Sequence, residues 1–366
     1  MQCRCSMSSR TEVVATTILR WVVGATFLFS GLTKCVDPVG SAIYVEKYLA
    51  TYSLETFLPL SEGIAVTLAV VETLLGVLLV TGVLRHITSL ISLLILSLFT
   101  VVTLLSATVL PIGECGCFGD ILKLTPWQTF LKNIVLLVLC YLLWRCRGEK
   151  HPIVPKNGIA VIVGIVVPLG VSLYALRHLP LVDTMPYRVE TALYDAVAME
   201  RDKEEQAVCN ILIFKNIKTG ESVEFDASDG VCWEDDDLEF VEAVTRRMSV
   251  ETTYDDLRLY DSEGEDRTLD VIGRKGRVAL LCINDTKDIS ARHLRGINSL
   301  LTQYPLRAIV VLTAVDMSDI EDVISVSDVE MYAVDAMTLR SVIRSDIGVV
   351  VLRDGVVEFK SDIRDI

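Results

Sequence analysis

The hydrophobic positions divide the chain into two halves with different patterns. Residues 1–180 contain long, nearly uninterrupted apolar runs, whereas residues 181–366 contain short apolar runs separated by charged and turn-forming residues. A run of about 20 apolar residues is long enough to cross a bilayer as a helix. Short alternating runs are typical of strands and amphipathic helices in water. The pattern therefore predicts a membrane domain followed by a water-soluble domain.

Five segments of the first half have the length and hydropathy of membrane-spanning helices. They are residues 13–32, 61–84, 87–110, 127–144 and 158–176. The first span lacks a small-residue cleavage site and is therefore expected to remain as an anchor. Residues 39–60 are too polar to span, but Tyr44, Tyr48 and Tyr52 recur every four residues. That spacing predicts a short helix at the membrane interface, with its tyrosines at the level of the lipid headgroups.

The charges are as unevenly distributed as the apolar runs. The first 180 residues hold 13 Lys and Arg against 9 Asp and Glu, and the remainder holds 21 against 39. This balance excludes the basic surface typical of nucleic-acid-binding proteins. Four basic residues lie between the fourth and fifth spans, so the positive-inside rule places residues 145–156 in the cytoplasm. The chain is therefore expected to be a multi-pass protein of the inner (cytoplasmic) membrane, with its acidic half on the extracytoplasmic side.

Three charged residues lie within or at the edge of the predicted spans. Arg20 and Lys34 share one stripe of the first helix with glycines, and Glu72 lies among small residues on the second. Small residues allow close helix packing, and a charge inside a membrane requires a partner. We expect the two stripes to face each other, with Glu72 neutralised by Arg20 or Lys34. This arrangement fits either a proton or ligand site, or a device for packing and orientation.

The loop between the third and fourth spans contains Cys115 and Cys117 on either side of Gly116. Residues two apart lie at most about 7 Å from each other, so a bend at the glycine lets the thiols form a disulfide. Such a small ring is easily reduced, which favours a redox pair over a structural crosslink. The alternative is an inert tight turn. Cys35 is either a third member of a thiol relay or an isolated thiol.

The ten cysteines include no C-x-x-C spacing, so the sequence predicts no zinc site and no other metal site. No motif identifies a cofactor, and none supports a quinone.

The membrane half resembles a known family. The segments that carry the resemblance are residues 19–24 (LRWVVG), 29–34 (FSGLTK), 36–38 (VDP), 72–76 (ETLLG) and 115–120 (CGCFGD). They resemble the DoxX-like proteins, and among these the methylamine utilisation protein MauE family, over roughly residues 10–145. The resemblance implies a four-helix membrane bundle, broadly similar to the vitamin K epoxide reductase type. It also implies a role in maturing or exporting a disulfide-rich periplasmic enzyme subunit.

The acidic half ends in alternating strand and helix patterns. Strands are predicted at 278–283, 308–313, 330–334, 349–353 and 356–360, and helices at 289–304, 318–324 and 336–344. This alternation predicts an α/β sheet, in an order similar to the thioredoxin-like fold. Residues 284–288 (NDTKD) stand where that fold carries its redox cysteines, and Ile347-Gly348 stands where it has a cis-proline. We therefore expect a binding or scaffolding module, in which Cys282 is part of the core.

These patterns combine into one expected architecture. It is an α-helical membrane bundle with a four-helix DoxX/MauE-like core at 10–148 and a fifth transmembrane helix at 149–180. A connecting region at 181–269 is expected to hold a hairpin over 208–225 and a helix over 235–248. An extracytoplasmic, thioredoxin-like α/β domain is expected at 270–366.

Three functions fit this architecture. The first is an envelope membrane protein that handles thiols or assists protein maturation through Cys115 and Cys117, with an extracytoplasmic client protein as partner. Under this first function, oxidoreductase-like activity would belong to the membrane domain and not to the C-terminal domain. The second is a structural membrane scaffold with inert cysteines. The third is a small-molecule or proton carrier that uses Arg20 and Glu72.

The predicted topology can be tested with reporter fusions. Fusions after Lys150 and after Asp183 are expected to report opposite sides of the membrane, because one predicted span separates them. The side of each fusion point is measured with two reporters. One is an enzyme that is active only in the periplasm, and the other is a protein that fluoresces only in the cytoplasm. The same side for both fusions would show that the topology is wrong.

Overall fold

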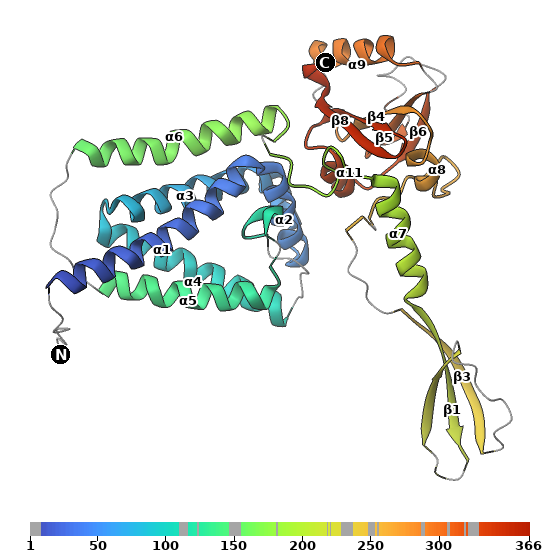
Figure 1. Cartoon of the computed structure of the whole chain (residues 1–366), viewed down its shortest axis with the longest axis horizontal. Coiled ribbons are helices and arrows are strands. Elements are labelled where there is room, and N and C mark those ends of the chain that lie inside the picture. The colour runs from blue at the N-terminus through green and yellow to red at the C-terminus, as the bar shows by residue number, and fades with distance from the viewer. Residues whose placement is uncertain are drawn as a thin grey trace. The chain divides into compact units, whose positions relative to one another are not determined.

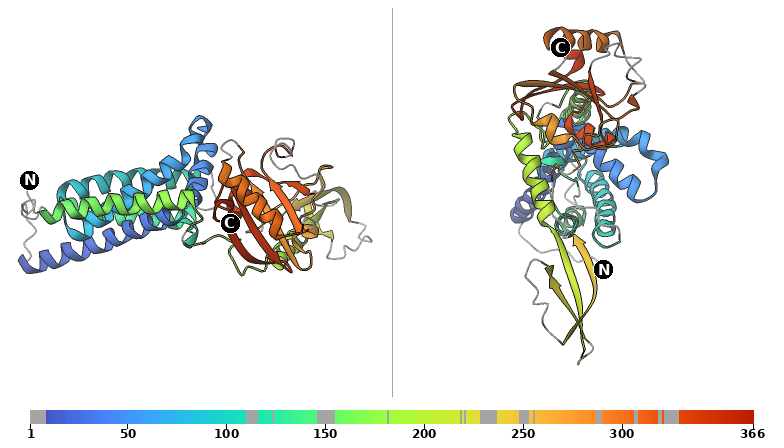
Figure 2. Two further views of the ribbon diagram at one scale, coloured as in Figure 1. Left: turned by 90° about the horizontal axis from the view of Figure 1, so that it is seen from above. Right: turned by 90° about the vertical axis from the view of Figure 1, so that its right-hand side faces the viewer.

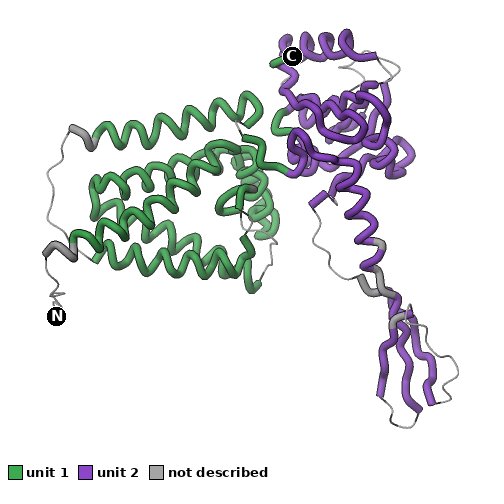
Figure 3. Tube along the Cα trace, in the orientation of Figure 1, with its two compact units in different colours: residues 1–185, 343–345, 365 green, residues 186–342, 346–364, 366 purple. Residues whose placement is uncertain are grey.

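The computed structural model describes residues 9–109, 116–122, 124–145, 155–180, 182–217, 219, 221–227, 237–247, 253–254, 256–286, 290–305, 308–317, 320 and 329–366. The chain forms two compact units (Figure 3). Residues 1–185, 343–345 and 365 belong to the first unit, and residues 186–342, 346–364 and 366 belong to the second.

The first unit is helical. Its elements are α1 (Ser9–Val36), α2 (Pro38–Thr51), η1 (Glu55–Leu60), α3 (Ser61–Thr81), α4 (Arg85–Thr108), η2 (Gly119–Ile121), α5 (Pro126–Arg145) and α6 (Pro155–Arg177). Among the described residues, α1 and α3 to α6 are long and apolar enough to cross a membrane. Each coincides with a predicted span, which confirms a multi-pass helical membrane domain.

Close approach of α1 and α3 organises this bundle (Figure 1). α1 packs along α3, α4 packs along α5, and α6 packs against α3. A Cβ added at Gly31 would lie 2.5 Å from the backbone nitrogen of Thr73, and one added at Gly76 would lie 2.6 Å from that of Leu28. Glycines on both helices therefore bring the two backbones together, as small residues do in membrane helix pairs. Cys140 on α5 lies in the apolar core that fills the bundle.

The predicted interfacial helix is present as α2. Asp37 caps its amino terminus, since Asp37 Oδ1 accepts a hydrogen bond of 2.7 Å from the Gly40 amide, and Pro38 occupies the first turn. Tyr48 and Tyr52 are half-buried and stack with their centroids 6.5 Å apart. Tyr44, in contrast, is buried. The three tyrosines therefore differ in environment, although the sequence predicted that all of them would lie at the level of the lipid headgroups.

The second unit is built on a five-stranded sheet with helices on both faces (Figures 1 and 2). The strand order is β6-β5-β4-β7-β8. The strands are β4 (Arg277–Ile283), β5 (Ile309–Thr313), β6 (Glu330–Ala333), β7 (Ile347–Arg353) and β8 (Val356–Asp362). β4, β5 and β6 are parallel, and β7 and β8 form the predicted antiparallel hairpin. The predicted α/β sheet is therefore present, and the helix expected at 318–324 lies outside the described residues apart from residue 320.

Alternate residues of the strands bury themselves on opposite sides of this sheet. Leu281 and Val349 face α9 (Ala291–Gln303), which contributes Ile297 and Leu300 to the core. Leu280 and Val350 lie on the other side, among residues of α7 (Leu193–Gln206), α8 (Thr268–Ile272) and α11 (Ala336–Val342). Strands covered on both faces are continuously apolar, which explains why β4 and β7 are hydrophobic at nearly every position.

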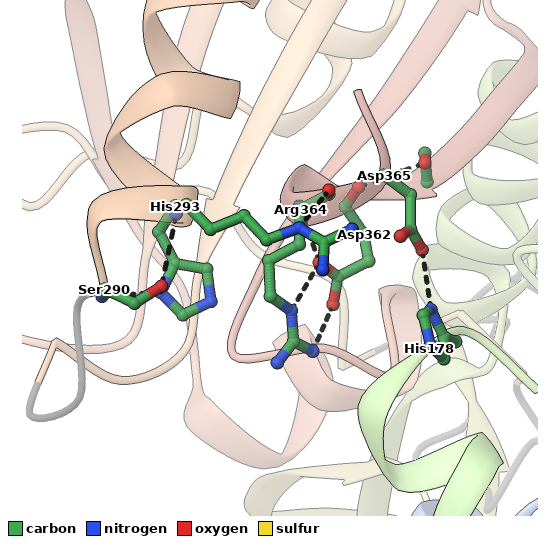
Figure 4. A network of polar contacts seen from close by, with 8 residues as sticks. His178, Ser290, His293, Asp362, Arg364 and Asp365 are labelled. Atoms are coloured by element: carbon green, nitrogen blue, oxygen red, sulfur yellow. Dashed lines mark hydrogen bonds and ion pairs between the residues drawn. The ribbon is translucent and has the colours of Figure 1, made fainter.

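Local hydrogen bonds fix the ends of α9 and β8 (Figure 4). Ser290 caps α9 by accepting a hydrogen bond from the amide of His293, and His293 Nδ1 accepts one of 3.0 Å from the Ser290 amide. Arg364 Nη2 lies 2.6 Å from Asp362 Oδ2, and the Arg364 amide donates to the same carboxylate. The first pair of contacts caps the amino terminus of α9, and the second stabilises the short turn that follows β8.

A separate three-stranded sheet corrects one prediction. Its order is β2-β1-β3, with β1 at Val208–Asn216, β2 at Ser222–Asp226 and β3 at Leu238–Arg247. β1 and β2 form the predicted hairpin, but the helix expected over 235–248 is wrong, because most of this segment is β3. Phe214 of β1 packs against Phe240 of β3 and Phe225 of β2, with centroids 5.6 and 5.7 Å apart. Cross-strand packing of this kind overrides a helical spacing of apolar residues.

The packing of α9 against η5 (Ile363–Asp365), the short turn after β8, predicts that Gly296→Ala destabilises the second unit. A Cβ at this position would lie 1.9 Å from the carbonyl oxygen of Ile363, which is backbone and moves only with the whole segment. We expect the free energy of unfolding to fall by about 1–3 kcal/mol, as overpacked cores do. Urea denaturation of residues 185–366 measures it. Ser299→Ala, on the exposed face of the same helix, is the matched control and should change stability by less than about 0.5 kcal/mol.

Candidate functional site

The described part of the Cys-Gly-Cys loop is held by two side chains of α1. Ser30 Oγ and Lys34 Nζ each donate a hydrogen bond of 2.7 Å to the carbonyl oxygen of Cys117. Ser30 and Lys34 lie four residues apart, so they share one face of the helix. The backbone of Cys117 is therefore fixed at the end of α1 that leads into α2.

The ammonium that binds Cys117 also forms a buried ion pair. Lys34 Nζ lies 2.8 Å from Glu72 Oε2, and the two side chains are 9% and 2% exposed. The same nitrogen lies 2.8 Å from Ser30 Oγ. An ammonium has three donors, and here they are directed at a carboxylate, a hydroxyl and a loop carbonyl. The sequence predicted that Glu72 would have a cationic partner, and the structure assigns that partner as Lys34.

Arg20 belongs to a different site. Its Nε and Nη2 donate hydrogen bonds of 2.9 Å to the carbonyl oxygens of Leu79 and Val80, in the last turn of α3. Carbonyls at a helix carboxyl terminus lack intrahelical donors and attract cations. Fourteen residues separate Arg20 from Lys34, which corresponds to about 21 Å along a helix. The structure therefore does not bring Arg20 together with Glu72, as a carrier built on both residues would require.

The loop around Cys117 packs into the bundle on both sides. Gly116 has φ of 64°, and a Cβ there would lie within 2.4 Å of the Tyr44 ring. Only glycine combines that backbone conformation with so close a contact. Phe118 is buried, with its ring centroid 5.2 Å from that of Phe29, and Lys132 Nζ lies 4.1 Å from the Phe118 centroid. Cys117, between these two anchors, is half-buried.

The other candidate thiols lie in different surroundings. Cys115 lies outside the described residues, so its pairing with Cys117 stays a prediction. Cys35 is buried, with its Sγ 3.7 Å from Thr73 Oγ1, and its role as a relay also stays a prediction. Cys282 is fully buried in β4, and burial raises the pKa of its thiol to about 12. A thiol with so high a pKa is inert near neutral pH, which agrees with the core role expected for Cys282.

Sequence reasoning missed several residues that shape the site. Ser30, Tyr44 and Lys132 all contact the loop segment, yet none was singled out for this. Ser30 could have been found from its position one helical turn before Lys34. Among the described residues, no group of three or more His, Cys, Asp or Glu could hold a metal ion.

Comparison with known proteins identifies the domain that contains this site. Residues 12–145 match the family model described as "Methylamine utilisation protein MauE". This region is a MauE family domain. It contains Ser30, Lys34, Glu72 and the complete Cys-Gly-Cys loop, whereas α6 and the second unit lie outside it.

One curated relative was also found. The protein TlpB of Flavobacterium psychrophilum is 30% identical over 171 residues. The match covers 43% of this chain and 43% of that relative, which is less than half of either. No solved structure matches the chain significantly.

The buried pair in the MauE domain predicts a non-additive effect on stability. Glu72→Leu leaves the Lys34 ammonium without its carboxylate in an apolar interior, and Lys34→Met leaves the carboxylate without its cation. Removing one member of a buried pair typically costs about 3–5 kcal/mol. We expect each single variant to unfold at a lower temperature than the double variant Lys34→Met/Glu72→Leu. Thermal aggregation of the full chain in detergent measures this, and a double variant less stable than either single would contradict it.

Proposed function

We propose that this chain is a membrane protein of the bacterial envelope that handles thiols or assists the maturation of extracytoplasmic proteins through Cys115 and Cys117. The observation that carries the proposal is the pair of hydrogen bonds from Ser30 and Lys34 to the Cys117 carbonyl. They hold a half-buried cysteine in a fixed loop at one end of the bundle. A thiol-exchange site needs its sulfur in a defined position, because exchange requires direct attack on one sulfur atom.

The proposed chemistry is a thiol–disulfide exchange between the loop and a client. A client thiolate attacks the Cys115–Cys117 disulfide, a mixed disulfide forms, and one loop cysteine leaves as a thiolate. A second client thiol then displaces the other loop cysteine, so that the client is oxidised and the loop is reduced.

The proposal includes a location and a role for the second unit. We place the protein in the inner membrane with its Cys-Gly-Cys loop outside the cytoplasm. The loop then faces a compartment in which disulfides persist. Residues 270–366 of the second unit are proposed to be a thioredoxin-like module that holds a client without exchanging thiols. Its parallel strands and closing hairpin support this fold. The segment after β4 begins with Asn284 and Asp285 instead of cysteine.

A structural scaffold with inert cysteines is the second candidate. It is favoured by the glycine-mediated packing of α1 on α3, and by the Lys34–Glu72 pair, which connects the same two helices. A proton carrier has less support, because it needs a carboxylate that water reaches, and the Glu72 side chain is 2% exposed.

The redox state of the loop separates the first candidate from the second. We expect Cys115 and Cys117 to resist alkylation in membranes from cells with intact disulfide machinery, and to become alkylated after mild reduction. Mass spectrometry of the alkylated loop peptide measures both states. Equal labelling before and after reduction would favour the scaffold.

Trapping a client provides the complementary test. A Cys117→Ser variant retains Cys115 and cannot close the loop disulfide, so mixed disulfides with a client are expected to accumulate and to disappear on reduction. Cys35→Ser is the matched control, because Cys35 is buried against Thr73. If Cys35→Ser abolishes the loop disulfide, Cys35 belongs to the exchange pathway.

A further inference from the structure

One buried ammonium contacts the backbone of Cys117. Lys34 Nζ lies within 2.8 Å of Glu72 Oε2, Ser30 Oγ and the Cys117 carbonyl oxygen, so it connects α3, α1 and the loop. Ser30 Oγ donates to the same carbonyl oxygen of Cys117, so two side chains of α1 contact it. Phe118 contacts the Phe29 ring and the Lys132 ammonium, whereas Ser30 and Lys34 contact the backbone of Cys117 directly.

Stability alone does not account for the charges in this cluster. Transferring two ionised groups into an apolar interior is costly, and replacing a buried ion pair with well-packed apolar residues is often neutral or stabilising. Leucine and methionine at positions 72 and 34 would fill similar volumes between α1 and α3. Such a pair could not donate a hydrogen bond to Cys117. The feature that distinguishes the charged pair from an apolar pair is therefore its contact with the loop.

We propose that Lys34 is the positioning residue of the Cys-Gly-Cys loop, and that Glu72 holds the Lys34 ammonium in place. The redox consequence of this proposal rests on the proposed function. Gly116 already has the positive φ that bends the chain between the two cysteines. Fixing the Cys117 carbonyl restricts the conformations that the reduced loop can sample. Closing the disulfide then loses less chain entropy, so the anchor favours the oxidised loop.

The first test measures the equilibrium between the loop and glutathione. In this reaction two glutathione molecules reduce the loop disulfide to a dithiol and form one glutathione disulfide. We expect Lys34→Met to raise the equilibrium constant for reduction about tenfold, which is an increase of about 30 mV in the reduction potential of the loop. Full-length protein in lipid nanodiscs is equilibrated with glutathione buffers, acid-quenched, alkylated and quantified.

Two further variants separate positioning from general loosening of the bundle. Lys34→Met/Glu72→Gln removes both charges, so no unpaired buried ion remains, yet the loop still lacks its anchor. We expect it to shift the potential as Lys34→Met does. Arg20→Met is the matched control, because it removes another cation of α1 that binds α3, about 21 Å from Lys34. A shift in Arg20→Met equal to that in Lys34→Met would overturn the proposal.

A second readout does not depend on a disulfide. In a Cys115→Ser background, we expect a membrane-impermeant maleimide to label Cys117 at least about fivefold faster when Lys34 is replaced by Met, because the half-buried residue is released. Faster labelling in a protein whose wild-type loop never forms a disulfide would refute the proposed function and retain the positioning role. Unchanged labelling and unchanged potential in Lys34→Met/Glu72→Gln would refute the positioning role itself.

Discussion

The membrane domain depends on how it neutralises charge in an apolar interior. Lys34 and Glu72 come from different helices, and their charged atoms meet at 2.8 Å with almost no exposure to solvent. That contact requires the backbones of α1 and α3 to approach closely, which Gly31 and Gly76 permit. A larger residue at either glycine would separate the helices and leave two buried charges apart. Helix packing and charge pairing are therefore one constraint in this bundle.

The two ends of α1 meet this constraint in different ways. Near one end, Arg20 donates to two backbone carbonyls of α3. Near the other end, Lys34 has a carboxylate partner and retains a donor for the loop. Only the second arrangement connects the interior of the bundle to a cysteine. In the MauE domain, the cation near one end of α1 therefore binds α3. The cation near the other end also binds the loop for which we propose thiol exchange.

The second unit has a different physical basis. Its central strands are buried on both faces, and Cys282 lies within this core, where burial raises the pKa of its thiol to about 12. The segment that follows β4 has no cysteine. In the proposed function, thiol exchange takes place in the membrane domain, and the second unit contributes surface for binding.

The sequence alone determined the features that depend on local length and composition. Five apolar runs predicted five helices, because a spanning helix satisfies its own backbone within one segment. The alternation of strand and helix patterns after residue 277 predicted the α/β sheet, because such alternation is typical of that fold class. Tertiary structure decided the features that depend on contacts distant in sequence. Residues 238–247 became a strand because β1 supplied a pairing edge. Glu72 paired with Lys34 instead of Arg20 because the register of α1 on α3 decides which cation the carboxylate meets. The contacts of Ser30, Tyr44 and Lys132 with the loop could not be predicted, because no periodicity within the loop encodes what it packs against.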